Sequence, residues 1–234
     1  MTFTPTYIAI VPARGGSKGV PRKNLQYCAG KPLLSWTLEA AIKSNRLDEI
    51  ILSTDDEEIA QIGLDYNVRV VQRPAELASD VAQTEPVMLH ALDQLVDKDS
   101  HIKGVVLLQP TSPLRTGEHI DDAIHHFEQT GADSLVSVCE NHHFFWKDLD
   151  NLVPLYDYQN RPRRQDIQKQ DIWYRENGAI YISEKSGFYS NKNRLFGKIV
   201  PFVMNSAESL EIDSVDELIT ADGLLKHRIN PRLG

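Results

Sequence analysis

Cysteine and long apolar runs are both scarce in this chain of 234 residues. Its two cysteines, Cys28 and Cys139, fit neither a redox Cys-x-x-Cys motif nor a zinc-binding spacing. We therefore expect reduced thiols and no disulfide, as is usual for a cytoplasmic protein. No apolar run approaches the ~18 residues that a membrane span needs, and residues 1–6 lack the basic start of a secretory signal. These absences predict a soluble, unprocessed protein with no membrane partner.

Basic residues are also few relative to acidic ones: the chain has 25 Lys and Arg against 33 Asp and Glu, and its net charge is −8. This balance argues against a nucleic acid as the main partner and favours a small ligand. The two common glycine motifs for nucleotides, G-x-x-x-x-G-K-[ST] and G-x-G-x-x-G, are both absent. A kinase-like P-loop and a dinucleotide-binding oxidoreductase are therefore disfavoured.

Short apolar strands alternate with amphipathic helices along residues 7–138. This alternation predicts an α/β fold with a doubly wound, mostly parallel sheet. Two more strand patterns follow residue 177, so the core domain is expected to comprise residues 1–138 and 177–234. A last helix is expected over residues 214–225, and its spacing turns three apolar side chains toward the core: Val215, Leu218 and Ile219.

Residues 139–176 interrupt the alternation with a segment that is rich in aromatic and polar residues and has no clear period. Its aromatic side chains are Phe144, Phe145, Trp146, Tyr156, Tyr158, Trp173 and Tyr174. So many exposed aromatic rings would be unusual on a monomer, so we expect a small protruding dimerisation arm that packs on a second subunit. A lid over the active site of a single subunit is the alternative.

A basic loop, PARGGSKGVPRKN over residues 12–24, follows the first predicted strand. Its adjacent glycines let backbone N–H groups approach an anion closely, and four cations lie in the same turn: Arg14, Lys18, Arg22 and Lys23. Ligands of open α/β sheets bind at this end of the strands, so the loop favours a polyphosphate. Arg14 and Lys23 are the best candidates for phosphate contacts, whereas Arg22 is equally consistent with a solvated side chain. The alternative is a basic surface turn.

An acidic pair, Glu211 and Asp213, precedes the last predicted helix. In an extended strand the two carboxylates would project from the same face. Two acids that face a triphosphate are sufficient for a magnesium site, because Mg²⁺ takes carboxylate, water and phosphate oxygens. The alternative is that Asp213 only caps the last helix while Glu211 is solvated.

A proline-rich turn, QPTSPLR over residues 109–115, follows the predicted central strand. Gln109, Thr111 and Ser112 offer neutral hydrogen bonds, which suit a polyhydroxylated substrate such as a sugar. Arg115 is expected either to meet a carboxylate or to form a structural ion pair.

With these features in view, residues 8–217 resemble the N-acylneuraminate cytidylyltransferases. The segments that carry the resemblance are the basic loop, STDD (53–56), RPAELA (73–78), LQPTSPLR (108–115), NGAIYI (177–182) and EID (211–213). The resemblance implies a Rossmann-like nucleotidyltransferase fold and a magnesium-dependent transfer of CMP from CTP to the anomeric hydroxyl of a sialic-type sugar acid, with release of pyrophosphate. It also implies a homodimer whose arms exchange between subunits.

Carried over by position, the resemblance implies roles for individual residues. Those expected at the triphosphate are Arg14, Ser17, Lys18 and Lys23, and those beside the cytidine are Asn24, Arg73 and Thr84. Those expected at the sugar acid are Gln109, Ser112, Lys147 and Arg163, with Arg164 able to exchange roles with Arg163. The Mg²⁺ ion would be held by Asp213 and Glu211, and the catalytic residues would be Arg14, Lys23 and Asp213.

Two departures from the family pattern matter. Many members have Asp where this chain has Glu211, and the arm aligns only approximately. N-acetylneuraminate is the expected acceptor, while legionaminic acid, pseudaminic acid and another sugar acid, such as an eight-carbon one, stay open. A non-catalytic CTP-binding regulator is the rival from another class. No residue stands out as a general base.

Overall fold

The computed structural model describes residues 6–95 and 102–230. Within these residues, seven strands form one sheet in the order β11-β7-β10-β6-β1-β4-β5. All neighbours are parallel except β10, which runs antiparallel to β6 and β7. In chain order, the strands are β1 (Thr6–Pro12), β4 (Glu49–Thr54), β5 (Arg69–Gln72), β6 (Ile102–Leu107), β7 (Ser134–Asn141), β10 (Trp173–Glu184) and β11 (Ile199–Met204). The predicted doubly wound, mostly parallel sheet is confirmed.

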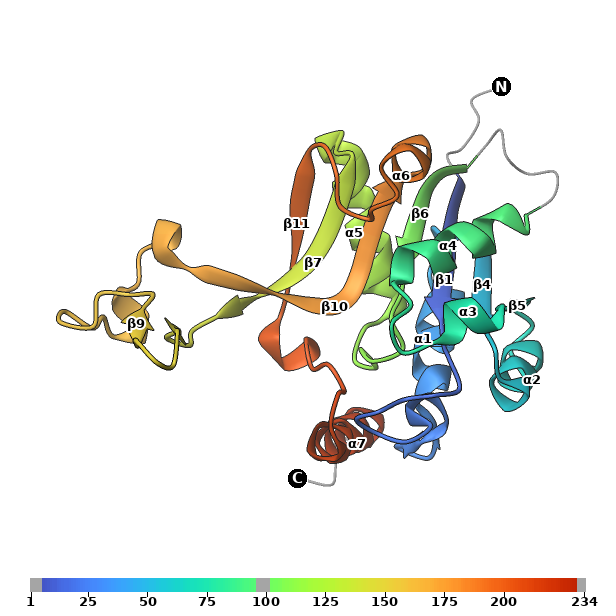
Figure 1. Ribbon diagram of the computed structural model, residues 1–234, viewed down its shortest axis with the longest axis horizontal. Coiled ribbons are helices and arrows are strands. Elements are labelled where there is room, and N and C mark those ends of the chain that lie inside the picture. The colour runs from blue at the N-terminus through green and yellow to red at the C-terminus, as the bar shows by residue number, and fades with distance from the viewer. Residues whose placement is uncertain (1–5, 96–101, 231–234) are drawn as a thin grey trace.

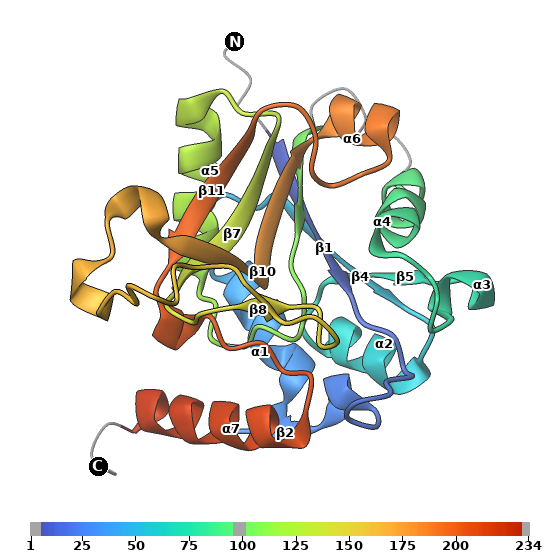
Figure 2. The ribbon, with the colours of Figure 1, turned by 60° about the vertical axis from the view of Figure 1, so that its left-hand side comes forward.

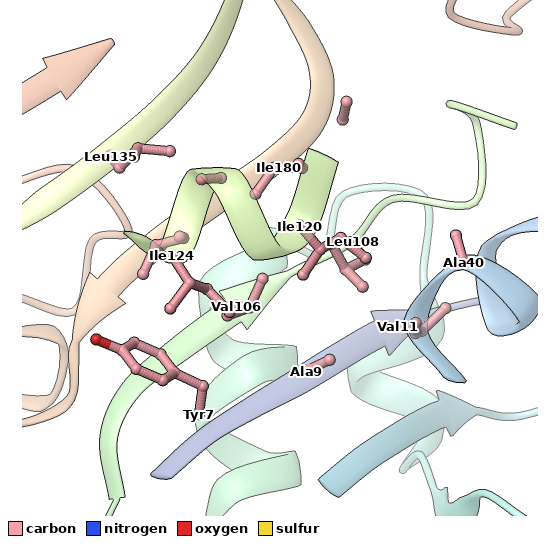
Figure 3. Packing of buried hydrophobic residues seen from close by; sticks show 14 of the residues in the cluster. Tyr7, Ala9, Val11, Ala40, Val106, Leu108, Ile120, Ile124, Leu135 and Ile180 are labelled. Carbon is pink, nitrogen blue, oxygen red and sulfur yellow. The ribbon is translucent and has the colours of Figure 1, made fainter. Parts of the chain in front are cut away.

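Helices cover both faces of the sheet, as Figure 1 shows. They are α1 (Leu33–Ile42), α2 (Glu57–Asp65), α3 (Ala75–Ala78), α4 (Thr84–Asp93), α5 (Gly117–Thr130), α6 (Lys185–Asn191) and α7 (Val215–Ile229). Because side chains alternate along a strand, Ala9 and Val11 of β1 pack under α1, α2 and α5, whereas Ile8 and Ile10 pack under α4 and α6. Figure 3 shows the first of these two layers.

The last helix differs from the sequence expectation. Helix α7 packs not on the sheet but on the hairpin of β2 (Tyr27–Cys28) and β3 (Lys31–Pro32), beside which it lies in Figure 2. Its buried residues are Ala221 and Leu225, with Leu218 partly buried. The prediction was wrong for Val215 and Ile219, which are 53% and 65% exposed.

An arm extends from the core at one side (Figure 1). Strands β7 and β10 continue outward as a paired ribbon, and β8 (Trp146–Lys147) pairs with β9 (Val153–Pro154) at its far end. Exposed aromatic side chains lie along it: Phe145, Trp146, Tyr158, Trp173 and Tyr174. No helix among residues 6–95 and 102–230 is long and apolar enough to cross a membrane.

Candidate active site

A polar cavity of about 270 Å³ lies at the carboxyl edge of the parallel strands. Its walls come from the segments that follow β1, β5 and β6. In open α/β sheets the carboxyl ends of the strands form the ligand-binding edge, so the topology alone brings these distant segments together.

The cavity gathers eight of the residues that the sequence assigned to a site. They are Arg14, Ser17, Lys23, Asn24, Arg73, Thr84, Gln109 and Thr111. The predicted Lys18 lies outside its lining, with a side chain that is 79% exposed. Lys147, Arg163 and Arg164 belong to the arm and do not line this cavity of their own chain.

The basic loop is held in place by the acidic start of α2. The N–H of Gly15 donates to Oδ1 of Asp55 at 3.0 Å, and a methyl group at position 15 would lie 2.6 Å from Oδ2 of Asp56. Glycine is therefore required here for a close approach. Arg22 bonds to Asp56 at 2.7 Å and to Glu58 at 2.8 Å, so it anchors the loop from outside the cavity.

Two cations of the loop are paired with a carboxylate that the sequence analysis missed. Nη2 of Arg14 lies 3.0 Å from Oδ1 of Asp80, and Nζ of Lys18 lies 3.2 Å from its Oδ2. Arg14 also donates to the carbonyl of Ser79 at 2.8 Å. Asp80 lies two residues after the RPAELA segment but sits in no periodic pattern, so only its nearness to a family segment could have pointed to it.

The acidic segment meets the basic loop at Lys23. Its Nζ donates to the carbonyl of Ile212 at 2.6 Å and to Oδ1 of Asp213 at 3.0 Å. The N–H of Ile212 in turn donates to the carbonyl of Thr111, in the proline-rich turn, at 2.9 Å. The segment therefore joins the basic loop and the turn at one edge of the cavity.

Two expectations about this segment were wrong. Residues 209–213 form an irregular stretch and not a strand. The N-cap of α7 is Ser214, which forms a capping box with Glu217, so Asp213 does not serve as the cap. The capping alternative for Asp213 is thereby removed, and its side chain is 71% exposed beside Lys23.

Glu211 is more enclosed than Asp213. Burial, and then the charge of Asp213, raises the pKa of Glu211 above its usual value. A methyl group at Gly178 would lie 2.5 Å from Oε1 of Glu211 and 2.8 Å from Oε1 of Gln109. Gly178 has a φ of 64°, so both its backbone and its lack of a side chain let Glu211 and Gln109 approach the strand β10.

Two buried arginines differ in what they can offer a ligand. Arg73 donates to the carbonyl of Ser53 at 2.7 Å, lines the cavity, and has a pKa lowered to about 10 by burial, so it remains cationic at neutral pH. Arg115 donates to the carbonyl of Ala179 at 2.6 Å and to Oγ1 of Thr37 at 2.7 Å. Arg115 therefore has a structural role. Among the described residues it contacts neither the expected carboxylate nor an ion-pair partner, so both expectations for it were wrong.

A buried hydrogen-bond network centred on Asn177 supports the acidic segment. Its Nδ2 donates to Oγ of Ser209 at 2.9 Å, and its Oδ1 accepts from Oγ of Ser137 at 2.6 Å. Ser112 is fully buried and donates to the Asn177 carbonyl at 3.2 Å. The NGAIYI segment had no assigned role from the sequence, and here it connects the proline-rich turn to the start of the acidic segment.

A doubly wound α/β sheet with a cationic cavity at its carboxyl edge defines a protein of the Rossmann-like class. The chain belongs to the cytidylyltransferase family, whose model matches residues 8–213.

Curated relatives agree with this assignment. An N-acylneuraminate cytidylyltransferase of Streptococcus agalactiae serotype III (strain NEM316) is 35% identical over 93% of this chain and 53% of its own length. One of Escherichia coli O18:K1:H7 is 35% identical over 88% and 49%. A CMP-N,N'-diacetyllegionaminic acid synthase of Legionella pneumophila is 32% identical over 88% of this chain and 90% of its own length. The chain thus spans about half the length of the first two relatives.

Solved structures share the fold at low sequence identity. CMP:2-keto-3-deoxy-manno-octonic acid synthetase in complex with CTP matches with a TM-score of 0.72 and 15% identity, over 95% of this chain and 99% of that one. The 4-diphosphocytidyl-2C-methyl-D-erythritol synthase of Anaerococcus prevotii matches with a TM-score of 0.70 and 15% identity, over the same shares.

Proposed function

We propose that this protein transfers CMP from CTP to the anomeric hydroxyl of a nonulosonic acid. The observation that carries the proposal is the meeting of the basic loop and the late acidic segment at Lys23 and Asp213, beside a single cavity. Family membership and the names of the relatives support the same reaction.

The triphosphate would bind to Arg14, Ser17, Lys18 and Lys23, and the cytidine would lie by Asn24, Arg73 and Thr84. Arg73 is held in place by hydrogen bonds to the hydroxyl and the carbonyl of Ser53. Its guanidinium therefore has a fixed position from which it can donate a hydrogen bond to the cytidine. Asn24 stiffens the loop by donating to the carbonyl of Arg14 at 3.0 Å.

In the reaction, the anomeric hydroxyl loses its proton to solvent and its oxygen forms a bond to the α-phosphorus. The bond from that phosphorus to the bridging oxygen breaks, and pyrophosphate leaves. Reactions of this kind need positioning and charge neutralisation more than covalent help, and the loop cations provide both.

A divalent metal, for which we propose Mg²⁺, fits the residues present. Glu211 and Asp213 supply carboxylate oxygens, and Lys23 occupies only Oδ1 of Asp213 among the described residues. No cluster of three or more His, Cys, Asp or Glu side chains occurs there, so phosphate and water oxygens would have to complete the coordination. When bound, the ion would neutralise charge on the phosphates.

We propose a homodimer built by the arm, residues 139–176, with residues 1–138 and 177–234 as the core domain. The exposed aromatic rings of the arm and its cavity of about 740 Å³ support an occupied interface there. In such a dimer, Lys147 and one of Arg163 and Arg164 would reach the sugar site of the other subunit. The alternative, a lid over its own subunit, has less support because the arm extends away from the core (Figure 1).

The acceptor is proposed to be N-acetylneuraminate, with the legionaminic acid derivative as the second candidate because the Legionella relative carries that name. We also propose a cytoplasmic location, for which the two buried free cysteines are the support.

A pyrophosphate-release assay with CTP tests the function. The acceptors are N-acetylneuraminate, N,N'-diacetyllegionaminate, pseudaminate and the eight-carbon sugar acid, each with and without Mg²⁺. We expect turnover with one nine-carbon acid and little with the eight-carbon acid. Binding of CTP without turnover on any acceptor would instead identify a regulator.

A further inference from the structure

Two cations of the basic loop that we propose as triphosphate ligands, Arg14 and Lys18, are paired with a carboxylate of the same chain. Asp80 uses both carboxylate oxygens, one at 3.0 Å from Arg14 and the other at 3.2 Å from Lys18. A phosphate group binds two neighbouring cations in the same way, through separate oxygens. An incoming phosphate therefore has to displace the Asp80 carboxylate before it can bind to Arg14 and Lys18.

The segment of Asp80, residues 79–83, is held mainly at Ser79, whose carbonyl accepts hydrogen bonds from Arg14 at 2.8 Å and from the N–H of Ala82 at 3.2 Å. The side chain of Asp80 itself is held by its two ion pairs. The segment contributes Ser79, Asp80, Ala82 and Gln83 to the cavity wall. Val81, the residue after Asp80, is 88% exposed, so no apolar packing of its side chain fixes the segment. Displacing Asp80 from the two cations therefore disturbs no buried contact of Val81.

We propose that Asp80 is an internal competitor of the nucleotide phosphates and sets the charge that a ligand needs in order to bind. This inference rests on the proposed function, because it takes Arg14 and Lys18 as triphosphate ligands. A triphosphate or pyrophosphate offers several anionic oxygens and displaces a single carboxylate, whereas a ligand without phosphates leaves Asp80 in place. After the transfer, the return of Asp80 to Arg14 and Lys18 competes with pyrophosphate and favours its release.

The proposal predicts a gain of affinity when an acidic residue of the cavity is removed. The Asp80→Asn substitution frees both cations, so CTP and pyrophosphate should each bind about fivefold more tightly or better, given the strength of exposed ion pairs. Cytidine lacks phosphates, so its affinity should not change. A general loosening of the segment would instead change the binding of all three ligands, because the segment lines the cavity.

Glu58→Gln is the matched control. It also removes one negative charge near the basic loop, but Glu58 pairs with Arg22, which does not line the cavity. Any long-range effect of the net charge should appear equally in this variant. Asp80→Ser provides a second variant with the same change of charge and a smaller side chain.

The experiment is isothermal titration of CTP, pyrophosphate and cytidine into the wild-type protein and the three variants. We expect the two Asp80 variants to gain affinity for CTP and pyrophosphate, and Glu58→Gln to change by less than about twofold. The inference is overturned if the wild type binds CTP and the Asp80 variants gain no more than Glu58→Gln, or if cytidine gains as much as CTP. If no protein binds CTP or pyrophosphate, the proposed function fails and the inference fails with it.

A double-mutant cycle checks the contact itself. If Asp80 acts by occupying Lys18 and Arg14, then the gain from Asp80→Asn should shrink in a Lys18→Met background. An undiminished gain in that background and in an Arg14→Ala background would overturn the assigned contacts.

Discussion

The Nζ atom of Lys23 lies 3.0 Å from Oδ1 of Asp213, although 190 positions separate the two residues in the chain. The approach is close along the backbone as well, because a methyl group at Gly19 would collide with the carbonyl oxygen of Asp213. The basic loop and the acidic segment are therefore built against each other. A metal ion on Asp213 would lie directly beside Lys23, which we propose as a triphosphate ligand.

Asp213→Asn tests this arrangement. The substitution keeps the size of the side chain and removes the charge that would hold a metal ion. Losing one such contact in a transition state typically lowers the rate by ~10²–10³, or ~3–4 kcal/mol. We expect a fall of this size in the kcat of pyrophosphate release, with an unchanged far-UV circular dichroism spectrum. Near-normal turnover at saturating Mg²⁺ would refute the metal assignment.

The arginines of the basic loop should separate into two roles. Arg14 lines the cavity, whereas Arg22 pairs with Asp56 and Glu58 outside it. We expect Arg14→Ala to raise the KM for CTP by about tenfold or more, since a charged hydrogen bond is worth ~1.5–3 kcal/mol. Arg22→Ala should lower the melting temperature slightly and leave kcat/KM within about twofold, because exposed ion pairs contribute little. Equal kinetic losses in the two variants would contradict the separation.

The alternation of strands and helices could be predicted from the sequence because it depends on local apolar periods and on short connections. The same logic failed for α7, where two sets of apolar residues compete for the buried face. Val215 and Ile219 fit a helical stripe as well as Ala221 and Leu225 do, and only the position of the β2–β3 hairpin decides between them. That position is a tertiary fact that no local pattern contains.

For the site, residue types in the basic loop were sufficient to predict Arg14 and Lys23 as cavity residues. Asp80 could not be predicted, because a carboxylate contradicts the purely cationic lining that a proposed phosphate site suggests. Ser112 was expected to face a sugar, yet its hydroxyl is turned inward to Asn177. The direction of a side chain in a turn depends on its buried partners, which sequence spacing does not supply.

Asn177→Ala should destabilise the fold through its buried partners. The substitution leaves the hydroxyl groups of Ser137 and Ser209 without the amide that they contact at 2.6 and 2.9 Å. An unsatisfied buried polar group costs ~1–3 kcal/mol, so we expect a loss of this size or larger in the free energy of unfolding in urea. Asn191→Ala is the control, because the exposed side-chain amide of Asn191 donates one hydrogen bond, to the carbonyl of Gly187. Losses of similar size in the two variants would argue against the network.

Gly178 and Gly131 together distinguish the effect of backbone strain from that of a steric clash with Glu211. Gly178 and Gly131 both have positive φ angles, 64° and 55°. Alanine at either position should therefore cost ~1–2 kcal/mol of stability, because an L side chain is disfavoured in the left-handed region. The surroundings differ, since a methyl group at Gly131 meets nothing within 4 Å whereas one at Gly178 would lie 2.5 Å from Oε1 of Glu211.

Kinetics should consequently distinguish the two variants when their losses of stability are alike. Gly178→Ala displaces Glu211 or Gln109, so its kcat should fall and the Mg²⁺ concentration needed for half-maximal activity should rise. Gly131→Ala lies at the end of α5, away from the cavity, so it should keep both values. Binding of Mn²⁺, followed by electron paramagnetic resonance, gives a second readout that does not depend on turnover. If Gly178→Ala binds Mn²⁺ and turns over as Gly131→Ala does, the close approach of Gly178 to Glu211 and Gln109 has no part in positioning the metal site.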